Sequence, residues 1–76
     1  MNKELFWDEL TKESREMARE WLSEYNGSDG IVGRLFELYE EGASAAGMDT
    51  EEYLEEITPN DYVSICYDGF LERKEF

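Results

Sequence analysis

Apolar residues at spacings of three and four predict an amphipathic helix over residues 11–25, TKESREMAREWLSEY. Thr11 is a suitable N-cap, because its hydroxyl can accept a hydrogen bond from a first-turn amide. Asn26 and Gly27 tolerate the left-handed conformation that ends helices. The rest of the chain is expected to pack around this helix. Its inner face, which repeats with a period of 3.6 residues, is Leu10, Ser14, Met17, Ala18, Trp21, Leu22 and Tyr25.

A second helix is expected to follow the loop NGSDG at residues 26–30. Ser28 or Asp29 is its expected N-cap, and Gly47 is a suitable residue just beyond its C-terminus. Gly42 is expected to interrupt this helix or to end it early, because glycine is a poor helix former. The expected inner face is Ile31, Val32, Leu35, Phe36, Tyr39, Ala43 and Ala46.

A third, short helix is predicted to begin after Asp49 and to end near Ile57. Asp49 fits the N-cap, and Glu52 three residues later is the residue type that completes a capping box. Residues 1–10 carry several aromatic and leucine side chains, but they are too few for periodicity to choose between a helical turn and an extended lead-in.

The segment after Thr58 supports two interpretations. Thr58 followed by Pro59 is a specific helix start, and we expect that helix to end at Asp68-Gly69. However, YVSICY at residues 62–67 is rich in residues that favour strands. The sequence therefore predicts an all-α fold, a compact bundle of four or five short helices in a single helical domain over 1–76. The alternative is an α+β fold with a C-terminal strand or hairpin around 62–72.

The composition narrows the class of protein. Seven Lys and Arg against twenty Asp and Glu give a net charge of −13, which argues against direct binding to nucleic acid or to an anionic membrane. Cys66 is the only cysteine, so no internal disulfide can form, as is usual in a reducing cytosol. No apolar run is long enough for a membrane span, and no signal peptide is visible.

Candidate chemistry is sparse. Without histidine the chain has no Ser-His or Cys-His pair, and GSDGIVG lacks the spacing and the lysine of a phosphate-binding loop. A calcium loop starting at Asn26 fails because Ile31 occupies the sixth position, where glycine is needed. Cys66 is best interpreted as a small core residue. We therefore expect no enzyme activity, no cofactor and no metal site.

The distribution of charge is more informative. Between Arg34 and Arg73 the chain holds eleven acidic residues and no cation. Like charges four residues apart destabilise a helix, so this run suggests either a solubility surface or one shaped for a basic partner. Tyr39 or Tyr53 is suited to anchor such a contact, because aromatic residues dominate interface energies. The partner-binding residues that we predict are Glu37, Glu40, Glu41, Glu51, Glu52, Glu55, Glu56 and Tyr53.

Two resemblances point to a class of proteins. A short, histidine-free and strongly acidic chain resembles small phage-encoded anti-defence proteins, including anti-CRISPR proteins and DNA mimics. The segment WDELTKESREMAREW at residues 7–21 is similar to a pattern, [FW]DEL-[ST]-x-x-[AS]-x-x-x-A-R-x-W, of uncharacterised phage proteins that continue into a β-containing part. The first resemblance implies a phage-type inhibitor that covers a basic nucleic-acid-binding surface.

The expected partner is a basic protein, namely a bacterial defence nuclease or effector complex in the host bacterial cytosol. We expect no direct contact with nucleic acid or membrane, and a monomer or a homodimer. The alternative function is a helical protein-interaction module, such as an antitoxin or a phage regulatory subunit, that binds through an apolar patch while the acidic residues provide solubility.

Overall fold

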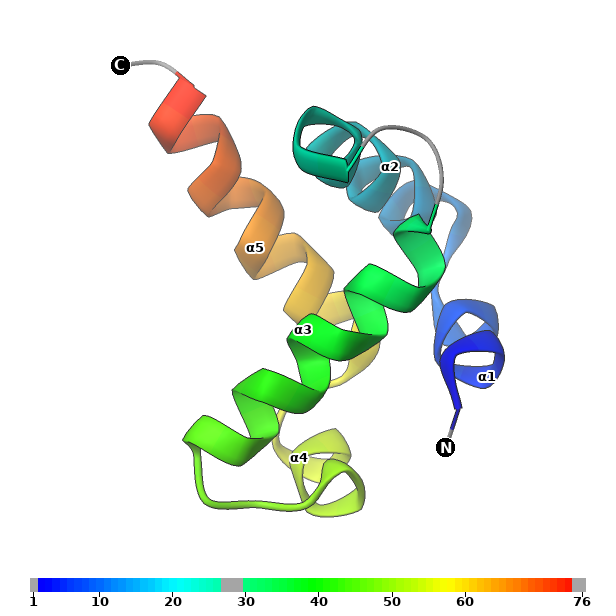
Figure 1. Cartoon of the computed structure of the whole chain (residues 1–76), viewed down its shortest axis with the longest axis vertical. Helices are drawn as coiled ribbons and strands as arrows, with labels where there is room; N and C mark the ends of the chain where they lie inside the picture. The colour runs from blue at the N-terminus through cyan, green and yellow to red at the C-terminus, as the bar shows by residue number, and fades with distance from the viewer. Residues whose placement is uncertain (1, 27–29, 75–76) are drawn as a thin grey trace.

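Five helices make up the parts of the chain that the computed structural model describes, residues 2–26 and 30–74. The all-α prediction is therefore confirmed, and the α+β alternative is wrong because residues 62–72 lie inside the last helix. Figure 1 shows α2 and α5 side by side, with α3 crossing them and α4 packed near the C-terminal end of α3. The helices are α1 Lys3–Glu9, α2 Lys12–Asn26, α3 Ile31–Ala45, α4 Thr50–Glu56 and α5 Pro59–Lys74.

Side-chain oxygens cap α1, α2, α4 and α5, the last three at the expected positions. Each N-cap oxygen accepts a hydrogen bond from the backbone amide three residues later, which satisfies one of the free donors of the first turn. The first ten residues, which the sequence left open, form a helix because Asn2 caps the Leu5 amide at 2.9 Å. The three expected pairs are Thr11 with Ser14 (3.1 Å), Asp49 with Glu52 (2.8 Å) and Thr58 with Asp61 (3.2 Å).

The ends of α3 are formed by glycines. Gly30 occupies the N-cap with a φ of 74° and no side-chain cap, whereas Gly27 and the expected caps Ser28 and Asp29 lie outside the described residues. Gly47 has a φ of 73°, and its amide donates to the Ser44 carbonyl at 3.0 Å. A left-handed glycine at this position satisfies the last carbonyls of a helix, as predicted.

Gly42 neither interrupts nor ends α3, so that expectation is wrong. The helix runs through it to Ala45. A Cβ atom at Gly42 would lie 3.1 Å from the hydroxyl oxygen of Tyr53. The missing side chain therefore lets α4 approach α3 closely, and this packing offsets a propensity cost of about 1 kcal/mol.

The last helix also extends beyond its predicted end at Asp68-Gly69. It continues to Lys74 because Phe70 is buried and packs between the rings of Tyr25 and Tyr67, at centroid distances of 6.4 and 6.1 Å. Tertiary packing of this kind overrides the weak helix propensity of a single glycine.

The core lies where α1, α2, α3 and α5 meet. Most of the predicted inner faces of α2 and α3 are buried or half-buried, but Tyr25 is 61% exposed and Ala46 is exposed, so these two expectations are wrong. Tyr25 lies in the last turn of α2, where its ring contacts Phe70 but remains largely exposed, and Ala46 is the C-cap of α3. The buried apolar cluster is Phe6, Leu10, Ala18, Trp21, Leu22, Ile31, Leu35, Tyr39, Val63 and Phe70.

Tyr39 lies at the centre of an aromatic cluster that joins four helices. Its fully buried ring packs against Phe6, Tyr53 and Tyr62 with centroid distances of 4.7, 4.9 and 5.1 Å. Its hydroxyl donates a hydrogen bond to the carbonyl of Ile57, which follows α4. Aromatic pairs in such tilted geometries each contribute roughly 0.5–1.5 kcal/mol beyond their buried area, so this cluster fixes α4 against the rest of the bundle.

Candidate functional site

The outer face of α4 carries four exposed carboxylates, Glu51, Glu52, Glu55 and Glu56. Tyr53 and Leu54 are half-buried against the core on the other face. Residues four apart on a helix have neighbouring side chains, with Cβ atoms roughly 5–6 Å apart, so the four carboxylates form one continuous surface. Among the described residues, none of them has a cationic group within 4.0 Å.

The electrostatics of α4 are unfavourable at one end. Glu51 and Glu52 lie in the first turn, where the positive end of the helix dipole stabilises negative charge. Glu55 and Glu56 lie in the last turn, which contains no basic residue. Their repulsion and their position near the negative end both oppose helix formation. The structure therefore gives no stabilising role to these two carboxylates.

Three further predicted residues, Glu37, Glu40 and Glu41, are exposed on α3. Glu37 forms a surface ion pair with Arg34 at 3.3 Å, so its charge is partly neutralised. By helical spacing, Glu37 lies on the side of α3 opposite to Tyr39 and Gly42, which α4 contacts, whereas Glu40 and Glu41 lie on the two flanks between. The structure thus brings the α4 carboxylates together, places Glu37 on a separate face and leaves Glu40 and Glu41 on the flanks of α3.

Tyr53, the predicted anchor, is committed to the fold. Its ring is half-buried against Tyr39, and its hydroxyl lies close to Gly42. The other suggested anchor, Tyr39, is fully buried. Both tyrosines therefore hold α4 against α3, and the exposed part of α4 is almost entirely carboxylate.

Two arginines of α2 lie near Trp7 of α1, in the N-terminal part of the chain. The guanidinium carbons of Arg15 and Arg19 lie 5.9 and 5.2 Å from the centre of the Trp7 ring, which is within range of a cation–π interaction. Arg15 also donates from Nε to the Trp7 carbonyl at 3.2 Å and lies 3.9 Å from an Asp8 carboxylate oxygen. Arg15 therefore joins the end of α1 to α2, whereas Arg19 faces a neighbouring cavity.

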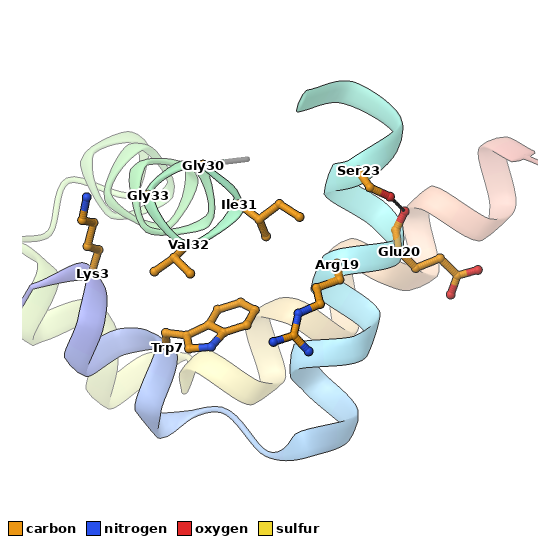
Figure 2. A pocket seen from close by; sticks show the side chains of 9 residues that line it. All are labelled: Lys3, Trp7, Arg19, Glu20, Ser23, Gly30, Ile31, Val32 and Gly33. Carbon is orange, nitrogen blue, oxygen red and sulfur yellow. Dashed lines mark hydrogen bonds between the residues drawn. The ribbon is translucent and has the colours of Figure 1, made fainter. Parts of the chain in front are cut away.

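This cavity has a volume of about 680 Å³ and lies between α1, α2 and the first turn of α3. Figure 2 shows the indole of Trp7 on one side, facing Ile31 and Val32 of α3, with Lys3 and Arg19 at opposite ends. The sequence pattern does not reveal this site, because the lining residues come from separate helices and lie up to about thirty positions apart. The sequence feature that could have pointed to it is the pair Arg15 and Arg19, four residues apart on one flank of α2. The complete lining is Lys3, Trp7, Arg19, Glu20, Ser23, Gly30, Ile31, Val32 and Gly33.

A carboxylate also borders the cavity, but it is engaged elsewhere. The hydroxyl of Tyr67 on α5 donates a hydrogen bond to Glu20, and this contact raises the pKa of Tyr67. In Figure 2 the carboxylate of Glu20 points away from Trp7. The functional groups that face the cavity are consequently cationic and aromatic.

A second, smaller groove lies between α2, α3 and α5. It has a volume of about 310 Å³ and is lined by Trp21, Leu22, Tyr25, Arg34, Leu38 and Arg73. Tyr25 is 61% exposed beside it. The groove is mainly apolar with a cation on each of two walls, so it differs in character from the acidic face of α4.

Cys66, the one cysteine of the chain, is not an activated nucleophile. Burial raises the pKa of the Cys66 thiol, although a hydrogen bond with Tyr62 acts in the opposite direction. A raised pKa disfavours the reactive thiolate. Residues 2–26 and 30–74 also contain no group of three or more ligating side chains placed to hold a metal ion.

Comparison of the chain with protein-family models, curated proteins and solved structures finds no match. No helix in the described part of the chain is long and apolar enough to cross a membrane.

Proposed function

We propose that this protein is a binding inhibitor that places the carboxylates of α4 on a basic, nucleic-acid-binding surface of a protein partner. The observation that carries the proposal is the outer face of α4, where four neighbouring exposed carboxylates lack a cation within 4.0 Å among the described residues. Closely spaced carboxylates resemble the charge density of a nucleic-acid backbone. The partner class is a bacterial defence nuclease or effector complex, as the resemblance to small phage proteins implies.

Two features support a binding role for this acidity. Glu55 and Glu56 are placed where they oppose helix formation, so a sequence optimised for stability alone would carry a cation there. In addition, the aromatic packing of Tyr53 holds α4 in a fixed position. A preorganised charged surface loses less entropy on binding than a mobile one does.

The test compares two variants with the same change in net charge. In the first, Glu51, Glu52, Glu55 and Glu56 are all replaced by Gln, which keeps helix propensity. The matched control replaces four exposed carboxylates of α1 and α2 that have no side-chain partner among the described residues. These are Glu4, Glu9, Glu13 and Glu16.

A partner is first captured from lysate of a bacterium that carries defence systems and is then purified. Binding of DNA or RNA to that partner is measured by fluorescence anisotropy at increasing concentrations of each protein. The parent protein and the control are expected to displace nucleic acid, and the α4 variant to be weaker by about tenfold or more. Association of the parent should slow as ionic strength rises.

The proposal would be contradicted if the α4 variant displaced nucleic acid as well as the parent does. It would equally be contradicted if the partner bound nucleic acid and this protein at the same time. Circular dichroism of both variants excludes loss of folding as the cause of weak binding.

A second candidate function is a helical interaction module that binds through an apolar surface. The observation that favours it is the groove beside Trp21, Leu22 and the exposed Tyr25. Replacing Tyr25 by Ala should then abolish partner binding, while the α4 Gln variant should bind normally. The same anisotropy and capture measurements separate the two functions.

A further inference from the structure

The cavity beside Trp7 has the size of a small-molecule site. Its volume of about 680 Å³ lies within the roughly 300–1,000 Å³ that is typical of ligand pockets. Two other cavities among the described residues hold about 310 and 230 Å³, at or below the lower end of that range. All nine lining residues belong to the described parts of the chain.

The walls of this cavity favour a flat ring. The indole of Trp7 faces Ile31 and Val32 across it (Figure 2). The aliphatic part of Lys3 extends the apolar surface, since its Cδ lies 3.8 Å from where a Cβ would stand on Gly33. An aromatic ligand ring can pack against an indole face and branched aliphatic side chains with favourable dispersion and quadrupole interactions.

The two cations at its ends are available to a ligand. Within residues 2–26 and 30–74, neither Lys3 nor Arg19 has a carboxylate within 4.0 Å, although the chain contains twenty acidic residues. Arg19 lies 5.2 Å from the centre of the Trp7 ring, so it combines a positive charge with the aromatic wall. The bordering carboxylate of Glu20 is held by Tyr67 and directed away.

We propose that this cavity binds a small anion that carries a flat aromatic or heteroaromatic ring. The ring packs between Trp7 and Val32, and the negative charge lies toward Arg19, while Lys3 at the other end adds a weaker, longer-range attraction. The net charge of the protein does not prevent this, because salt screens charges beyond roughly 8 Å at physiological ionic strength. The inference does not depend on the proposed inhibitor function, which uses other residues.

The direct test is an amide NMR titration of the labelled full chain with naphthalenesulfonate, a flat aromatic anion. Saturable shifts are expected at the Trp7 indole N–H and at the amides of Val32 and Gly33. Naphthol supplies the ring without the charge, and methanesulfonate supplies the charge without the ring. Both are expected to bind more weakly by about tenfold or more, since each lacks one half of the recognition.

Variants of the two cations test the charge requirement. Arg19→Gln should weaken naphthalenesulfonate binding by about threefold to tenfold, and Lys3→Gln should weaken it by clearly less. Lys12→Gln is the matched control, because Lys12 is an exposed cation of α2 outside the cavity and its loss changes net charge equally. The control should leave the affinity unchanged, and the NMR spectrum of each variant shows whether it is folded.

Four outcomes would overturn the proposal. These are absence of saturable shifts at the cavity, equal affinity for naphthol, equal affinity for methanesulfonate, and equal weakening by Lys12→Gln. The α4 Gln variant should still bind naphthalenesulfonate at least as tightly as the parent. Failure of the inhibitor function and failure of this site are therefore distinguishable in separate measurements.

Discussion

The side chain of Asn60, at the start of α5, accepts a hydrogen bond from the backbone amide of Thr11 at 2.8 Å. The Nδ2 atom of the same Asn60 side chain donates to the carbonyl of Glu9 at 3.1 Å. Asn60 thereby forms hydrogen bonds with backbone groups on both sides of the linker between α1 and α2, from which it is separated by 49 and 51 residues of sequence. Because Thr11 caps α2, Asn60 connects the starts of two helices.

Replacing Asn60 by Ala should therefore lower the free energy of unfolding by about 1–2 kcal/mol, since two exposed hydrogen bonds are lost. Asn60→Asp keeps the acceptor for Thr11 but loses the donor to Glu9, so an intermediate loss is expected. Urea unfolding followed by circular dichroism measures both changes. Equal stability of Asn60→Ala and the parent would show that the bridge contributes nothing.

Trp21 and Tyr25 provide a contrast on one helix. Trp21 is 7% exposed in the core, whereas Tyr25 is 61% exposed. Trp21→Ala should cost about 3–5 kcal/mol, which approaches the whole stability expected of so small a domain. Tyr25→Ala, as the control, removes only the contact of an exposed ring with Phe70 and should cost about 1 kcal/mol or less. Thermal melts of the two variants check this, and similar melting temperatures would contradict the burial of Trp21.

Local signals in the sequence predicted the helix starts, because a capping hydroxyl or carboxylate acts within three residues. Thr11, Asp49 and Thr58 all cap as expected. The errors in helix length occurred at Gly42 and Gly69, where tertiary packing with Tyr53 and Phe70 outweighs local propensity. Sequence spacing alone does not contain these contacts.

The candidate sites also differ in whether local sequence or tertiary contacts determine them. The carboxylates of α4 could be grouped from the sequence, because neighbours on one short helix are set by helical spacing alone. Whether Glu37 and Glu40 join them depends on which face of α3 the short helix contacts, and this is a tertiary property. The cavity beside Trp7 was missed for that reason as well, since its walls come from three helices.

The close approach of Tyr53 to Gly42 predicts that substitutions at these two positions have non-additive effects on stability. Gly42→Ala gains helix propensity, but its Cβ would lie 3.1 Å from the Tyr53 hydroxyl. In a Tyr53→Phe background the hydroxyl is absent, and Gly42→Ala should stabilise by roughly 0.5–1 kcal/mol. In the parent background the same change should gain clearly less or destabilise. A double-mutant cycle in urea measures the difference, and strict additivity would contradict the close contact.

The buried hydroxyl of Tyr39 predicts loss of stability in alkali. Burial, with a smaller contribution from Tyr53, raises the pKa of Tyr39 to about 12 from its ordinary value of 10.0. The folded state therefore holds this proton more tightly than the unfolded state does. The resulting contribution to stability is complete below pH 10 and is lost as the pH rises from about 10 to about 12.

The loss assigned to Tyr39 over this interval should be about 2 kcal/mol, since one pKa unit corresponds to roughly 1.4 kcal/mol. Urea unfolding at a series of pH values between neutral and strongly alkaline measures it. Tyr39→Phe is the informative comparison, although it also removes the hydrogen bond to the Ile57 carbonyl. That variant should be less stable at neutral pH but should lose less stability between pH 10 and 12. An equal alkaline loss in both proteins would assign the effect to other groups, such as Tyr62, whose pKa burial also raises.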